Sequence, residues 1–63
     1  MMLRYLLRIS AFHFCADIVL LGNKVVEAEP VVGYMRGWSR KHVDDYCRQR
    51  GWKTWKAWSE VHP

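Results

Sequence analysis

The sequence predicts a mainly α fold of two or three short helices with one short extended segment, assembled as an intertwined homodimer. Tryptophans recur at every third position at Trp52, Trp55 and Trp58, a spacing typical of one helix face. A helix-start signal at Ser39 is followed by a helix-end signal at Gly51. Apolar residues make up 51% of only 63 residues. A domain this small buries only about 60% of its unfolded surface, so a second copy is expected to cover the surplus.

The first third of the chain is an apolar block with polar interruptions. On a helical projection of residues 1–21, Arg4 and Arg8 share one side. The other polar residues of the block share nearly the opposite side: Ser10, His13 and Asp17. Two apolar faces remain between them, one for the chain's own core and one for a second copy. We therefore expect a helix over residues 10–21 and leave residues 1–8 open between helix and strand.

An extended alternative competes for the same region. Phe12-His13-Phe14 alternates, and apolar runs flank the turn signal Gly22-Asn23, as in a β-hairpin. Pro30 disfavours helix just before it, so a short extended piece is expected in residues 25–35, Val31-Val32 included. Whether residues 24–35 are helix or strand stays open. A lone strand there would have to pair with its counterpart in another copy.

The last third carries the clearest helical pattern. Ser39 is a good N-cap, and Gly51 stands where a glycine ends a helix. Opposite charges recur four residues apart, and such pairs stabilise a helix: Arg40–Asp44, Lys41–Asp45 and Asp44–Arg48. A second helix is expected from Trp52 or Thr54 to Glu60, with its tryptophans on one broad face.

The apolar surplus favours a protein that works by contact with itself and with a partner. Two copies are expected to entwine, leaving an apolar, tryptophan-lined cleft with basic edges for an amphipathic segment of a partner. The residues predicted to form these interfaces are Phe12, Phe14, Ile18, Leu21, Trp38, Trp52, Trp55 and Trp58.

The charge of the chain suggests a second class of partner. The net charge is +4, and residues 32–63 hold all of it. Candidate nucleic-acid contacts are Arg40, Lys41, Arg50, Lys53 and Lys56. The alternative function is a helix-turn-helix-like DNA-binding regulator using residues 39–60, with Gly51 in the turn. Against it, the second helix offers lysine and threonine where base edges are read by Arg, Asn or Gln. Its tryptophans can instead stack single-stranded bases.

The sequence contains few features that support other classes of function. No phosphate-binding glycine loop or nucleophile–base set is present, so we expect no enzyme and no cofactor. A zinc site could be drawn from His13, Cys15, His42 and Cys47, but these residues lack the usual ligand spacing, so no metal is expected. Charges within residues 1–21 argue against a stable membrane span. The apolar start of the chain imitates a signal peptide, but no small-x-small cleavage site follows it cleanly. Two scattered cysteines are typical of a cytoplasmic protein.

Two stretches carry a resemblance to a known group of proteins: Gly33-Tyr34-Met35-Arg36-Gly37-Trp38-Ser39 and Gly51-Trp52-Lys53-Thr54-Trp55-Lys56-Ala57-Trp58. With its small size and basic charge, the chain resembles a small early protein of temperate lambdoid bacteriophages, of the type encoded by short open reading frames between the exonuclease and excisionase genes. The resemblance implies a small, mainly helical homodimer in the host cytoplasm that favours lytic development by acting on host or phage regulation. It assigns no functional residue.

Overall fold

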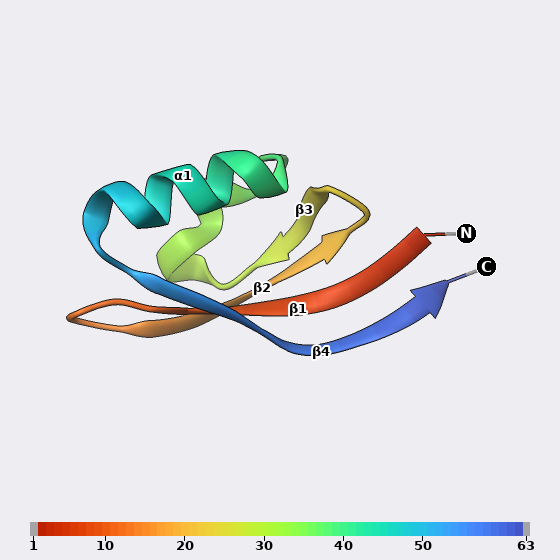
Figure 1. The fold of residues 1–63 in the computed structure, drawn as a ribbon, viewed down its shortest axis with the longest axis horizontal. Coiled ribbons are helices and arrows are strands. Elements are labelled where there is room, and N and C mark those ends of the chain that lie inside the picture. The colour runs from red at the N-terminus through yellow and green to blue at the C-terminus, as the bar shows by residue number, and fades with distance from the viewer. Residues whose placement is uncertain (1, 63) are drawn as a thin grey trace.

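Four antiparallel strands form a single sheet, and two helices lie across one of its faces (Figure 1). The computed structural model describes residues 2–62. The strands β1 (Met2–Ser10), β2 (Cys15–Leu21) and β3 (Lys24–Ala28) form a meander, and β4 (Lys53–His62) returns beside β1. The strand order is therefore β3-β2-β1-β4, with every neighbouring pair antiparallel.

The helix α1 (Arg40–Arg50) begins and ends where the sequence predicts. The side chain of Ser39 accepts a hydrogen bond from the backbone N–H of His42 at 3.1 Å, which caps the first turn. Gly51 adopts the left-handed conformation with φ of 76°, and its N–H donates to the carbonyl of Arg48. Both signals act within a few residues, so the helix and its boundaries are confirmed.

Residues 24–35, for which the sequence left helix and strand open, are divided between the two in the structure. Their first part pairs with β2 as β3, so the extended reading is right there. This strand pairs within its own chain rather than with a second copy. Val31 and Val32, expected to be extended, lie in the 3₁₀ helix η1 (Pro30–Met35). Pro30 explains this, because its fixed φ suits the first turn of a helix.

The core lies between the sheet and the two helices, and one chain closes it. Alternate residues of each strand point toward the helices, as the period of two requires. Among the described residues, the sheet contributes six side chains that are completely enclosed or nearly so: Leu7, Ile9, Ala16, Ile18, Leu20 and Val25. The helices contribute four: Val32, Met35, Val43 and Cys47. A folded interior therefore forms without the entwined second copy that the sequence suggested.

The prediction of a mainly α fold is wrong, because about half of the chain is in strands. The helix expected over residues 10–21 is instead a hairpin loop followed by β2, and the hairpin alternative at Gly22-Asn23 is correct. The second helix expected up to Glu60 is β4. The helical character implied by the phage-protein resemblance fails with it. In each case pairing with another strand supplies the backbone hydrogen bonds, and this outweighs a local helical pattern.

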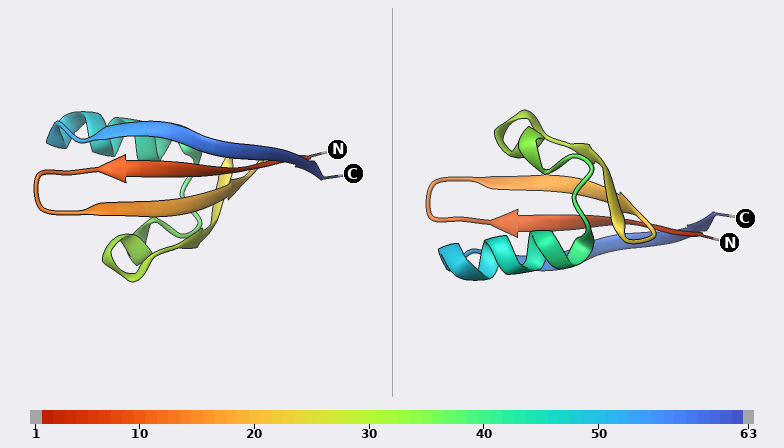
Figure 2. Two further views of the ribbon diagram at one scale, coloured as in Figure 1. Left: turned by 90° about the horizontal axis from the view of Figure 1, so that it is seen from below. Right: turned by 90° about the horizontal axis from the view of Figure 1, so that it is seen from above.

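The two edges of the sheet differ. Beside β3, the segment before α1 occupies the edge: Val25 N–H donates to the carbonyl of Trp38, and Gly37 N–H donates to the carbonyl of Val25, both at 2.9 Å. A further bridge joins Lys24 and Ser39. Beside β4, no strand of residues 2–62 pairs with the outer edge. Figure 2 shows β4 running along this margin of the sheet.

Candidate functional site

Within residues 2–62, no element covers the face of the sheet opposite the helices (Figures 1 and 2). Along β1, Tyr5, Leu7 and Ile9 are buried beneath the helices, while the residues between them point to the other side. On that open face Leu6 lies opposite Val19 of β2, and both are half-buried. The centre of the open face is therefore apolar.

A bulge in β4 brings two tryptophans onto this face. Leu6 pairs with Trp58 and Leu7 with Lys56, so Ala57 is an extra residue in β4. Trp55 pairs with Arg8. In a regular strand, residues three apart point to opposite faces, but the bulge shifts the alternation by one. Trp55 and Trp58 therefore share the open face, where Trp55 is 46% exposed and Trp58 is 40% exposed.

Charged side chains flank these indoles. The Arg4 guanidinium lies 5.5 Å from the ring centroid of Trp58, within the range of a cation–π contact. Arg8 donates two hydrogen bonds to Asp17, from Nε to Oδ1 at 2.8 Å and from Nη2 to Oδ2 at 3.2 Å. The hydrogen bond from Arg8 lowers the pKa of Asp17 below its ordinary value. The open face is thus an apolar centre bordered by charge, with Arg8 already neutralised.

The other two tryptophans belong to an aromatic cluster beside α1. Trp38 stacks on His42 with ring centroids 3.9 Å apart, and Tyr46 meets it edge-on at 5.1 Å. Trp52 packs edge-on against Phe14 at 5.1 Å and against Tyr46 at 5.7 Å. Trp38, Trp52 and Phe14 therefore hold the helix and the hairpin end to the sheet. The tryptophan stripe predicted for one helix face is divided between two sites.

The remaining residues predicted as interface are scattered. Ile18 is completely enclosed in the chain's own core, so a partner cannot reach it in this fold. Leu21 is half-buried on the open face, opposite Arg4. Phe12, at the tip of the hairpin between β1 and β2, is 93% exposed and touches His13 edge-on. Of the predicted set, Trp55, Trp58 and Leu21 share the open face.

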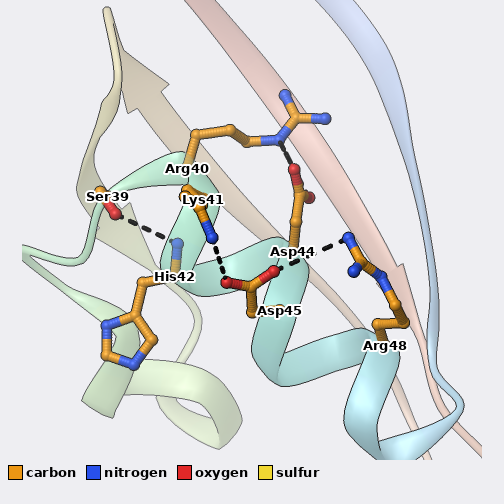
Figure 3. A network of polar contacts seen from close by, with 7 residues as sticks. All are labelled: Ser39, Arg40, Lys41, His42, Asp44, Asp45 and Arg48. Atoms are coloured by element: carbon orange, nitrogen blue, oxygen red, sulfur yellow. Dashed lines mark hydrogen bonds and ion pairs between the residues drawn. The ribbon is translucent and has the colours of Figure 1, made fainter.

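The basic residues predicted to contact nucleic acid are not arranged as one stripe. Arg40 and Lys41 form ion pairs with Asp44 and Asp45 at 3.0 and 2.8 Å, as Figure 3 shows. The same network includes Arg48, which lies 3.7 Å from Asp45 rather than pairing with Asp44.

Elsewhere, Arg50 lies over the ring of Tyr46 at 4.1 Å. Lys53 and Lys56 fall on opposite faces of β4 by register, opposite Ser10 and Leu7. A helix-turn-helix also requires a second helix, where this chain has β4.

The hollows of the surface lie away from the open face. One of about 460 Å³ is lined by polar residues at the start of α1 and by Asn23. A second, of about 370 Å³, lies beside Tyr5 and Lys56, and a third, of about 260 Å³, beside Trp52. Trp55 and Trp58 line none of these three. Because the indoles line none of these three hollows, their position suits a protein contact better than a small ligand.

No protein-family model, curated protein or solved structure matches this chain. Among residues 2–62, no helix is both long enough and apolar enough to cross a membrane. Within the same residues, no three potential metal ligands come together. The bulge that places Trp55 beside Trp58 is the feature that sequence reasoning missed. The alternation of Tyr5, Leu7 and Ile9 was the signal that could have revealed the strand beside it.

Proposed function

We propose that this chain is a non-enzymatic interaction protein that acts as a homodimer and uses the open sheet face, with its two indoles, to contact both a second copy and a partner. The observation that carries the proposal is the exposure of Trp55 and Trp58 beside Leu6 and Val19, on a face that no element of residues 2–62 covers. Contiguous apolar patches on a small domain mark interaction sites, and exposed tryptophan is the residue most enriched at the energetic centre of interfaces.

The chemistry of the face indicates the kind of partner. By register Arg4 and Lys24 lie on this face, both opposite Leu21, and Lys53 lies on it opposite Ser10. Glu27 lies on the same face, opposite Val19 and 4.0 Å from Arg4. An amphipathic segment with apolar residues and an acidic residue toward Lys24 or Lys53 would complement this surface. Taken with the resemblance described above, the proposed partner is a host or phage protein in the host cytoplasm. The proposed consequence is a bias toward lytic development.

Self-association is tested by sedimentation velocity over a concentration series. The wild-type chain is expected to shift from monomer to dimer as concentration rises. The double variant Trp55→Ala/Trp58→Ala should dissociate more readily, since loss of one indole at an interface centre costs about 2 kcal/mol, roughly 30-fold in Kd. The matched control is Phe12→Ala, which removes an exposed aromatic ring away from the open face.

Two results would count against the proposal. A chain that stays monomeric at every concentration removes the homodimer. Equal dimerisation of the wild type and the double variant removes the role of the indoles. A short single-stranded DNA added to the same series tests the alternative partner. Salt-sensitive binding to the DNA that the double variant loses would assign the face to nucleic acid instead.

A further inference from the structure

We infer that two copies join edge to edge through β4, with Trp55 of each copy opposite Trp58 of the other. This inference rests on the proposed homodimer and specifies its geometry. β4 is ten residues long, contains no proline and pairs with β1 along its length, while its other side is the terminal edge of the sheet. An edge strand presents unpaired N–H and C=O groups that another strand can satisfy.

The faces of β4 are compatible with a two-fold, antiparallel pair in which the tryptophans of the two copies meet. When Trp55 lies opposite Trp58 of the second copy, Thr54 lies opposite Ser59 of that copy. Thr54 and Ser59 both point to the helix-covered face, because within one chain they pair with Ile9 and Tyr5 of β1. Lys56 lies opposite the bulged Ala57, at the two-fold axis. A shift by one residue would set tryptophans of the open face against residues of the other face. The bulge thus makes the strand complementary to itself.

The same register sets Lys53 opposite position 60 of the second copy, and the arrangement recurs at the other end of the interface by symmetry. Lys56 lies near the axis in this register. Its Nζ lies 5.9 Å from the ring centroid of Tyr5, so the side chain leans inward over the sheet.

Edge pairing is favoured over packing two open faces together. Face-to-face packing would bury the ion pair of Arg8 and Asp17, whose side chains are 42% and 29% exposed, and desolvating it is costly. Edge pairing leaves that pair in water and brings the indoles of both copies side by side. Figure 1 shows α1 above the first part of β4, with the rest of the strand continuing beyond it.

Disulfide cross-linking between two different chains tests the register. In a Cys15→Ser background, one chain carries Thr54→Cys and the other Ser59→Cys. Opposed residues of an antiparallel pair lie about 4.5–5.5 Å apart, within reach of a disulfide. A mixture of the two chains oxidised with diamide is expected to form the cross-linked dimer. Each chain alone is the matched control, because in this register position 54 is far from position 54 of the other copy.

The outcomes separate the geometry from the proposed function. Cross-linking in the mixture but in neither chain alone supports the edge pair. A second pair, Lys53→Cys with Glu60→Cys, should behave in the same way and serves if the first pair does not fold. Sedimentation as a dimer with no mixed cross-link for either folded pair overturns the edge pair but leaves the homodimer. A chain that is monomeric throughout overturns both.

Discussion

Arg8 of β1 and Asp17 of β2 lie directly opposite each other and are joined by two hydrogen bonds on the open face of the sheet. The Asp17 backbone N–H also donates to a carboxylate oxygen of Glu29, at 2.8 Å. Asp17 thus connects β1 to the segment that follows β3. It stands beside the apolar centre of the face without being buried there.

This geometry predicts a pH dependence of stability. The hydrogen bond from Arg8 places the folded-state pKa of Asp17 below the 3.8 of a free carboxyl. The stabilisation by Asp17 is therefore fully present above about pH 3.8 and is lost as the pH falls through the folded-state pKa. Asp17→Asn should lower the melting temperature at neutral pH, and its difference from the wild type should shrink at strongly acidic pH.

Thermal unfolding followed by circular dichroism over a pH series measures both effects. The control is Glu27→Gln, since Glu27 is more exposed and lies 4.0 Å from Arg4, so its loss should change little. An Asp17→Asn variant whose deficit is the same at every pH would contradict the prediction.

The two faces of β2 should respond differently to truncation. Ile18 is fully buried under the helices, and its neighbour Val19 lies half-buried on the open face. Ile18→Ala should cost about 2–5 kcal/mol of unfolding free energy, because it leaves a cavity in a closed core. Val19→Ala should cost less than about 1 kcal/mol. Urea denaturation of both variants tests this, and similar losses at the two positions would be inconsistent with a strand here.

The end of α1 depends on a backbone conformation. Gly51 has φ of 76°, and a Cβ added to it would meet nothing within 4 Å. The cost of Gly51→Ala is therefore conformational, roughly 1–2 kcal/mol. Gly33→Ala is the matched control, because its surroundings are equally open and its φ is not positive. Chemical denaturation should show a loss for Gly51→Ala alone, and equal losses would place the cost elsewhere.

The two cysteines should differ in reactivity. Cys15 is exposed, whereas Cys47 is 1% exposed, and burial raises the pKa of the Cys47 thiol. In the native protein at neutral pH, a thiol reagent such as dithiobis-nitrobenzoate should label Cys15 rapidly. Cys47 should be labelled only when the protein unfolds. The Cys15→Ser variant should show no fast phase, and a persistent fast phase there would mean that α1 does not cover Cys47 stably.

The first strand shows why the N-terminal region was ambiguous in the sequence. Arg4 and Arg8 are four residues apart, and this spacing returns to the same side in both a helix and a strand. The decisive pattern was the alternation of Tyr5, Leu7 and Ile9, which are buried, with the residues between them. Hydrophobic content alone could not separate the two interpretations, because β2 and β4, the strands that pair with β1, come from further along the chain.

The spacing of the tryptophans led to a wrong prediction of a helix for a related reason. A three-residue spacing predicts a helix face, yet it also fits one face of a strand that contains a single bulge. The bulge at Ala57 is set by pairing with β1, as the register change between Leu6 and Leu7 shows. Nothing in residues 52–60 alone reveals it. The resulting neighbours, Trp55 and Trp58, are the centre of the proposed interface.

By itself the sequence determined α1, with its start at Ser39 and its end at Gly51, and it marked the turn at Gly22-Asn23. These features depend on caps and backbone conformations that act over a few residues. Only the tertiary structure decided that residues 2–10 and 53–62 lie side by side as strands, and which tryptophans reach the solvent. Strand hydrogen bonds join residues far apart in the chain, so the side that each residue faces is settled only when its partner strand is in place.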